Sequence, residues 1–134
     1  MGERRKEAYR VGFDRSVKIE FRGSRITSDA GLLAFRELDE ALGLTGTGCQ
    51  FLADIRTGRN TCHTLLAQLR QSVYSRLAGY EDTNDAEQLC NDPAMRRVVG
   101  GRALAHTAAS TSQMGRFETD VLTQCENLRV LMEL

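Results

Sequence analysis

Cys62 and His63 are the residues whose types could support nucleophilic catalysis, because a thiol needs an imidazole beside it as a base. They are neighbours in the sequence, at the start of a predicted helix. Adjacent residues on a helix point about 100° apart, so these side chains do not form a hydrogen-bonded pair. We interpret His63 as a residue that caps or packs the first helical turn.

Side chains that bind metals are present but poorly spaced. No C-x-x-C pair occurs among the cysteines Cys49, Cys62, Cys90 and Cys125, and His106 is distant from His63. The acidic cluster Glu81, Asp82 and Asp85 lacks the central glycine and closing glutamate of a calcium loop, and helix capping and solvation explain it. The sequence therefore predicts no metal site and no complete active site.

A basic segment near the C-terminus is the better functional candidate. A short helix, a glycine turn and a second helix with a polar first turn match a helix-turn-helix, whose recognition helix presents such residues to base edges. The candidate phosphate or base contacts are Arg96, Arg97, Arg102, Gln113 and Arg116. Met114 and Phe117 explain the second helix equally well as a core element.

Basic and acidic residues are equal in number, but they are concentrated in different segments of the chain. The 134 residues carry 18 basic and 18 acidic side chains, so no uniform field indicates nucleic acid or membrane as a partner. Residues 1–25 include 8 basic and 4 acidic residues. Residues 81–92 include 5 acidic residues and 0 basic ones, whereas residues 93–116 include 4 basic residues and 0 acidic ones. The absence of a long apolar run and the unpaired cysteines predict a cytoplasmic protein with reduced thiols.

Helical periodicity dominates the sequence, and its strongest signal is a central helix that begins at Thr61 and ends at Gly79. Five apolar residues recur there at three- and four-residue steps: Leu65, Leu66, Leu69, Val73 and Leu77. We therefore predict a mainly α fold, a multi-helix bundle with one short N-terminal strand and a possible helix-turn-helix near the C-terminus.

Other helices have clear start and stop signals. One begins after Thr27-Ser28-Asp29 and ends at Gly43. Its predicted buried stripe consists of Leu32, Phe35, either Leu38 or Asp39, and Leu42. The charged residues Arg36, Glu37 and Glu40 lie off this stripe. We read residues 45–48 as a turn and residues 50–55 as a short helix. Further helices are predicted from Thr83 or Asn84 to Cys90, from Asp92-Pro93 to Gly100, from Ser110 or Ser112, and over residues 126–134.

The N-terminal region has a different character. Residues 1–16 are predicted to form a basic flexible arm, and Val17–Phe21 alternates apolar and polar residues as a half-buried strand does. No second clear strand follows, so we expect its partner to come from another chain or a further domain. Because residues 129–134 are still helical, we also expect a truncated product.

Three stretches resemble the N-terminal part of bacterial insertion-sequence transposases of the DDE group 1 type, the insertion sequence 1380 family. The first is residues 26–33 with residues 36–39, the second comprises residues 63–66, 71–74, 78–85 and 92–94, and the third is residues 109–118. They occur in the family's order over residues 17–134, and their joint occurrence makes the resemblance specific.

The resemblance implies a DNA recombinase in which three carboxylates hold two divalent metal ions, most commonly magnesium, for attack on a phosphodiester. In that family the first catalytic aspartate follows the region matching residues 127–134. No aspartate of this chain matches the triad, so we expect no catalytic residue and no cofactor in it. Residues 17–134 would then be a DNA-binding and assembly region acting on terminal repeats, and a homo-oligomer is compatible with this role. The alternative is a structural or dimerisation module that packs on the catalytic domain.

Overall fold

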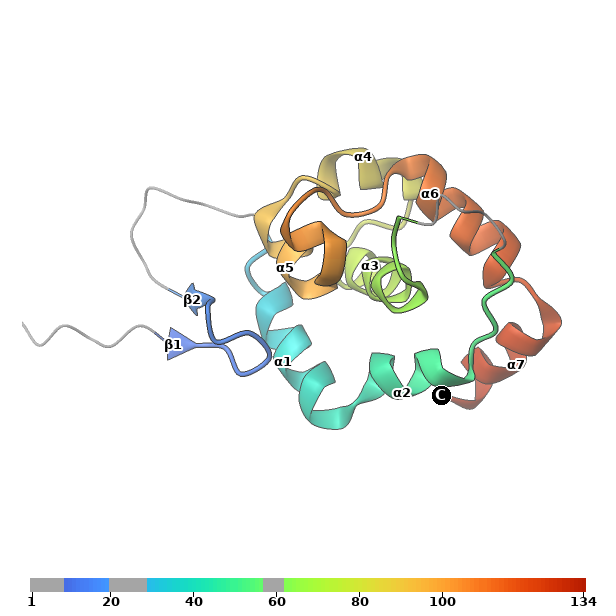
Figure 1. Ribbon diagram of the computed structural model, residues 1–134, viewed down its shortest axis with the longest axis horizontal. Coiled ribbons are helices and arrows are strands. Elements are labelled where there is room, and N and C mark those ends of the chain that lie inside the picture. Colours follow the sequence, from blue (N-terminus) through green and yellow to red (C-terminus); the bar gives the residue numbers. More distant parts are fainter. Residues whose placement is uncertain (1–8, 20–28, 57–61) are drawn as a thin grey trace, which may run out of the picture.

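The computed structural model describes residues 9–19, 29–56 and 62–134, and it places a central helix, α3 (Leu65–Leu77), among the other helices. Figure 1 shows α1 and α2 on one side of α3, α4, α5 and α6 on the other, and α7 at one end. The structure is mainly helical with one short two-stranded antiparallel sheet, which confirms the predicted fold class. No helix in the described ranges combines the length and apolar character that crossing a membrane requires.

Helix α1 (Leu32–Leu42) ends where predicted, at Gly43, whose φ of 66° is the left-handed conformation that glycine adopts most readily. The predicted buried stripe is correct at Leu32 and Asp39 but wrong at its other positions. The helix buries Leu32, Leu33, Arg36 and Asp39, whereas Phe35, Leu38 and Leu42 are exposed. Periodicity identifies residues that share a face, but the positions of the neighbouring helices decide which face is covered.

Residues 45–48, predicted to be a turn, lie inside helix α2 (Leu44–Phe51), which also includes the start of the predicted 50–55 helix. The physical reason is a helix cap supplied from α1. Asp39 Oδ1 accepts from the Thr45 backbone N–H at 2.8 Å, and Asp39 Oδ2 accepts from Thr45 Oγ1 at 2.5 Å. A carboxylate at a helix N-terminus satisfies unpaired N–H groups there and offsets the cost of the glycines.

Helix α3 begins at Thr64, whose hydroxyl accepts from the Ala67 backbone N–H at 3.1 Å. The predicted start at Thr61 lies outside the described residues, and the cap is three positions later. Gly79 stops the helix as predicted, with a φ of 93°. The helix is covered on several sides, so it also buries polar residues between its apolar positions: Gln68, Gln71, Ser72 and Ser75.

The predicted strand pairs within the chain, which corrects the expectation of an external partner. Strand β1 (Tyr9–Arg10) pairs antiparallel with β2 (Lys18–Ile19), with Tyr9 opposite Ile19 and Arg10 opposite Lys18. Of the predicted arm, residues 1–8 lie outside the described residues and residues 9–16 form β1 and the following turn. The connection is stabilised because Asp14 accepts from the backbone N–H and hydroxyl of Ser16 at 3.0 and 2.6 Å.

The second half of the chain follows its predicted caps closely. Asp82 caps the 3₁₀ turn η1 (Thr83–Asp85), which leads into α4 (Ala86–Leu89), one residue earlier than the predicted cap. Asp92 caps α5 (Pro93–Val99), and Ser110 caps α6 (Thr111–Arg116). The remaining elements are the 3₁₀ turn η2 (Gly101–Leu104), the π-helical turn η3 (Phe117–Val121) and α7 (Cys125–Glu133).

Two apolar clusters hold these elements together. One joins α1, α3 and α5 with the hairpin and contains Val11, Tyr74 and Met95, each 1% exposed or less. The other joins α3, α6 and η3 and contains Leu69, Met114 and Phe117. Because α3 contributes to both, burial of its surface couples the two halves of the domain.

Candidate nucleic-acid interface

The five predicted DNA contacts fall on two parts of the molecule. Arg96 and Arg97 lie on α5 and Arg102 on the adjoining η2, whereas Gln113 and Arg116 lie on α6. Helix α5 packs against α1, α3 and η2, while α6 packs against η1 and η3. The two groups therefore lie on separate elements with different packing partners (Figure 1).

Arg96 is largely committed to the fold. Its Nε donates to the Ala103 carbonyl at 2.8 Å and its Nη2 to the Leu104 carbonyl at 3.1 Å. A guanidinium with five donors in a fixed fork is well suited to satisfy the carbonyls of a short 3₁₀ turn. Arg96 therefore positions η2, and with it Arg102.

Arg97 and Arg102 are exposed cations. Arg97 Nη1 lies 3.4 Å from Asp14 Oδ2 in an ion pair whose arginine side chain is 46% exposed. An exposed pair of this kind contributes little to stability and is easily replaced by another anion. Arg102 lies close enough to His63 that, together with the larger effect of burial, its charge lowers the pKa of that imidazole.

Gln113 is occupied by a capping box, which the sequence analysis missed. Its Oε1 accepts from the Ser110 backbone N–H at 2.8 Å, and Ser110 Oγ accepts from the Gln113 backbone N–H at 3.4 Å. The S-x-x-Q spacing was the available signal. Arg116 is exposed at the end of α6, with its Nε donating to the Ser112 carbonyl at 3.3 Å.

The predicted helix-turn-helix is not seen. Helices α5 and α6 are separated by residues 100–110, which include η2, whereas a helix-turn-helix joins its helices by a turn of about 3–4 residues. The Ala108 backbone N–H in this connection donates to the Cys90 carbonyl at 2.9 Å, so the segment is pinned to the end of α4. The arginines of α5 and η2 therefore do not depend on a recognition helix for their placement.

A buried polar network that sequence reasoning did not identify lies where α1, α2 and α3 meet. Asp39 accepts from Thr45 and from the Tyr74 hydroxyl, and Arg70 Nε donates to Thr45 Oγ1 at 3.1 Å. Burial raises the pKa of Tyr74 most, and its hydrogen bond to Asp39 raises it further. Asp39 lies six residues before Thr45 and is not the N-cap residue of α2, so no capping pattern in the sequence indicates this bond.

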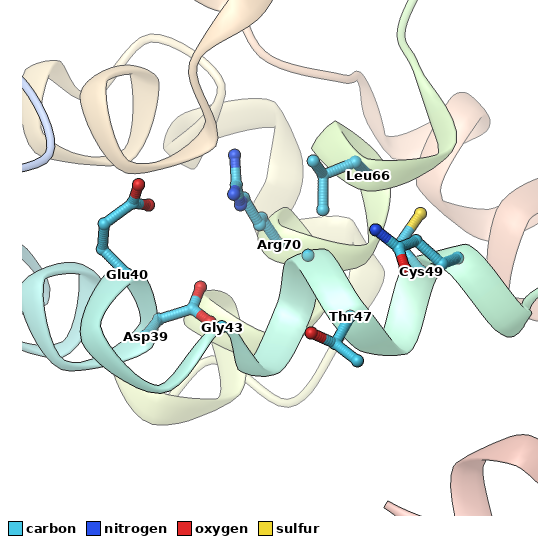
Figure 2. Close-up of a pocket in the computed structure, with 9 residues that line it drawn as sticks. Asp39, Glu40, Gly43, Thr47, Cys49, Leu66 and Arg70 are labelled. Carbon is cyan, nitrogen blue, oxygen red and sulfur yellow. The ribbon is translucent and has the colours of Figure 1, made fainter.

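A pocket of about 520 Å³ adjoins this network, and Figure 2 shows Arg70 extending into it from α3, with Glu40 and Asp39 on one side. Cys49 and Thr47 of α2 line the opposite side. Burial lowers the pKa of Arg70 and raises that of the Cys49 thiol, so the thiol is a poor nucleophile. The pocket has one cation and two carboxylates but no base–nucleophile pair.

The comparison with family models gives a match to the transposase DDE domain, group 1, over residues 9–132. The chain belongs to this transposase family. Searches of characterised proteins and of solved structures return no match. The match covers the hairpin, helices α1 to α6, most of α7 and all five predicted contact residues, which connects the exposed arginines to a protein family that acts on DNA.

Among the residues that the structure describes, the metal-binding side chains are not arranged as the two-metal centre that the DDE resemblance implies. That centre needs three carboxylates around divalent ions. Across residues 9–19, 29–56 and 62–134, no group of three or more His, Cys, Asp or Glu side chains is placed to hold a metal ion. Asp39, the most buried carboxylate described above, is instead satisfied by Thr45 and Tyr74.

Proposed function

We propose that this transposase chain serves DNA transposition as a DNA-binding and assembly region, with Arg97 and Arg102 as its main contacts to the phosphates of the element's terminal repeats. The exposure of these two cations on adjacent elements is the observation that carries the proposal. No acidic residue occurs within residues 93–116, so Arg97 is paired only from outside this segment, by Asp14 at the surface. Arg116 would add a separate phosphate contact from α6.

Arg96 and Gln113 take supporting roles in this proposal. Arg96 fixes the turn that presents Arg102, and Gln113 fixes the first turn of α6. Both side chains already hold turns of the native fold through hydrogen bonds, whereas Arg97 needs only to exchange one carboxylate for another anion to contact DNA. Phosphate contacts position a protein on a duplex and give salt-dependent affinity.

We infer further that strand cleavage in this family requires carboxylates and magnesium that this chain does not supply. The support is the lack of a carboxylate cluster among the described residues. Purified chain incubated with terminal-repeat DNA and Mg²⁺ is expected to leave the DNA uncut, and metal-dependent cutting would contradict this part of the proposal. For a protein with this role we propose a cytoplasmic location.

The DNA-binding proposal is tested by titrating the chain against terminal-repeat duplexes at several salt concentrations. Neutralising Arg97 and Arg102 to Gln removes two phosphate contacts and should make the log–log salt dependence shallower by about 1.8. Arg129→Gln on α7 is the control, because Arg129 is also exposed but lies at the far end of the bundle. An unchanged slope in the double variant would reject these residues as contacts.

The outward face of α1 supports a second candidate, in which the chain packs on another protein surface such as the catalytic domain or a second protomer. Phe35, Leu38 and Leu42 are 45%, 55% and 68% exposed and follow one face of the helix. Apolar faces of this kind usually mark interaction sites. Light scattering of the wild type against Leu38→Glu, with Leu128→Glu as control, is expected to show loss of association only for the α1 variant.

A further inference from the structure

The hairpin carries two like charges in an unusual arrangement. Arg10 and Lys18 are directly opposite each other across β1 and β2, and both are exposed. Opposed like charges on paired strands are destabilising, because their side chains start only about 4.5–5.5 Å apart. Lys18 has no ion pair with any residue that the structure describes. A bound anion would relieve this repulsion.

The hairpin is firmly attached to the helical core. Val11, directly after β1, is fully buried in the first apolar cluster. The Phe13 backbone N–H donates to Glu37 Oε1 at 2.7 Å, and the Arg36 guanidinium lies 5.0 Å from the centre of the Phe13 ring. These contacts fix the backbone that carries the hairpin cations, which lowers the entropy cost of binding.

The hairpin surface is continuous with the arginines of α5. Asp14, in the turn of the hairpin, forms the ion pair with Arg97. Arg10 Nη1 also donates to the Arg15 carbonyl at 2.9 Å, which links the strand to the exposed Arg15. The surface made of Arg10, Arg15, Lys18 and Arg97, called here the hairpin surface, therefore spans the hairpin and the edge of α5.

The carboxylates beside the hairpin surface are engaged by the fold. The hydroxyl and backbone N–H of Ser16, more than the charge of Arg97, hold the pKa of Asp14 below its ordinary value. Glu37 accepts backbone hydrogen bonds from Gly12 and Phe13, which lower its pKa. Four cations thus face two carboxylates that already have partners, so the surface retains an excess of positive charge.

We propose that the hairpin surface is a second, sequence-independent contact to the phosphate backbone of duplex DNA. The inference rests on the proposed function and extends it from α5 to the N-terminal hairpin. Arg10 and Lys18, held side by side, would contact the phosphates together, while Arg97 joins this contact to that of Arg102. An acidic protein surface or an anionic membrane is the competing occupant.

The test uses a short fluorescent duplex of arbitrary sequence, since phosphate contacts do not read the bases. Lys18→Gln should reduce affinity several-fold and make the salt dependence shallower by about 0.9, and Arg10→Gln with Lys18→Gln by about 1.8. Lys18 makes no hydrogen bond to a described residue, so its replacement does not disturb the fold. Arg129→Gln has the same change in net charge and should leave the slope unaltered.

A variant that is expected to strengthen DNA binding, rather than weaken it, separates DNA contact from a structural role. Asp14→Asn keeps an acceptor for Ser16 but removes the charge that pairs with Arg97. It should therefore bind the duplex several-fold more tightly, although it weakens an interaction of the native fold.

The outcomes distinguish the two proposals. If the wild type binds duplex DNA but Lys18→Gln matches Arg129→Gln and Asp14→Asn gains nothing, the hairpin inference is wrong and the α5 proposal stands. If the wild type binds no duplex, both fail. Charge-dependent binding to vesicles containing phosphatidylserine, without duplex binding, would assign the surface to membranes and also overturn the inference.

Discussion

The Tyr74 hydroxyl donates a 2.6 Å hydrogen bond to Asp39 Oδ2, and this bond joins the last turn of α3 to the last turn of α1. Tyr74 is 1% exposed and Asp39 7%. The other Asp39 oxygen accepts from the first turn of α2, so one carboxylate fixes the mutual positions of three helices. A buried carboxylate is tolerated here because each of its oxygens has a donor.

Tyr74→Phe should destabilise the domain by about 1.5–3 kcal/mol, the usual contribution of a hydrogen bond to a charged group. Urea unfolding followed by circular dichroism measures the change. Tyr80→Phe is the matched control, because the Tyr80 hydroxyl forms no hydrogen bond with a described residue. Equal stabilities for the two variants would show that the Tyr74–Asp39 bond contributes nothing net.

Asp39 should also make the free energy of unfolding depend on pH in the acidic range. Burial by itself raises its pKa, but the hydrogen bonds from Thr45 and Tyr74 and the charge of Arg36 outweigh burial, so its pKa lies below 3.8. A carboxyl with a lowered folded-state pKa adds stability above its unfolded pKa, and this stability is lost as pH falls through the folded value. The stability advantage of the wild type over Asp39→Asn should therefore be constant near neutrality and shrink below about pH 4. Urea midpoints across this range measure it, and an advantage that grows in acid would contradict the assignment.

Gln71→Leu should be among the most damaging substitutions in α3. The Gln71 amide donates to the Ala109 carbonyl and accepts from the Ala109 backbone N–H, both at 2.8 Å, and it is 1% exposed. Leucine would leave two buried backbone groups unpaired at about 1–3 kcal/mol each. Thermal unfolding compares it with Gln50→Leu, an exposed site on α2. A melting temperature close to that of the control would show that Ala109 finds other partners.

The thiols provide a chemical check of the fold. Cys125 is exposed, Cys90 is buried, and burial raises the pKa of Cys90 above its ordinary value. Because the thiolate is the reactive form, Ellman's reagent should modify Cys125 rapidly and Cys90 only on unfolding. Single-cysteine variants followed by mass spectrometry assign the rates. Fast labelling of Cys90 in the folded protein would mean that α4 is not packed as described.

The proposed interface shows how far sequence reasoning extends to function. Charge sorting along residues 93–116 singles out a basic segment, but by itself it treats the arginines there as equivalent. Only the structure distinguishes Arg97, paired weakly at the surface, from Arg96, bonded to the backbone of η2. The structure also places Arg10 and Lys18 opposite each other. The sequence does not show this pairing, because strands of two residues are too short to give a recognisable pattern.

The sequence alone determined where most helices begin and end. The start and stop signals act through their own backbone and the next few residues, so the local sequence is enough to identify them. They are Asp92-Pro93, Gly43, Gly79 and Ser110. The tertiary structure decided which faces are covered and which polar groups are buried. Asp39 meets Tyr74 and Gln71 meets Ala109 across 35 and 38 residues, and the Ala53 backbone meets the Asn127 amide across 74. Burial of such groups is favourable only when a distant partner satisfies them, and periodicity contains no information about that partner.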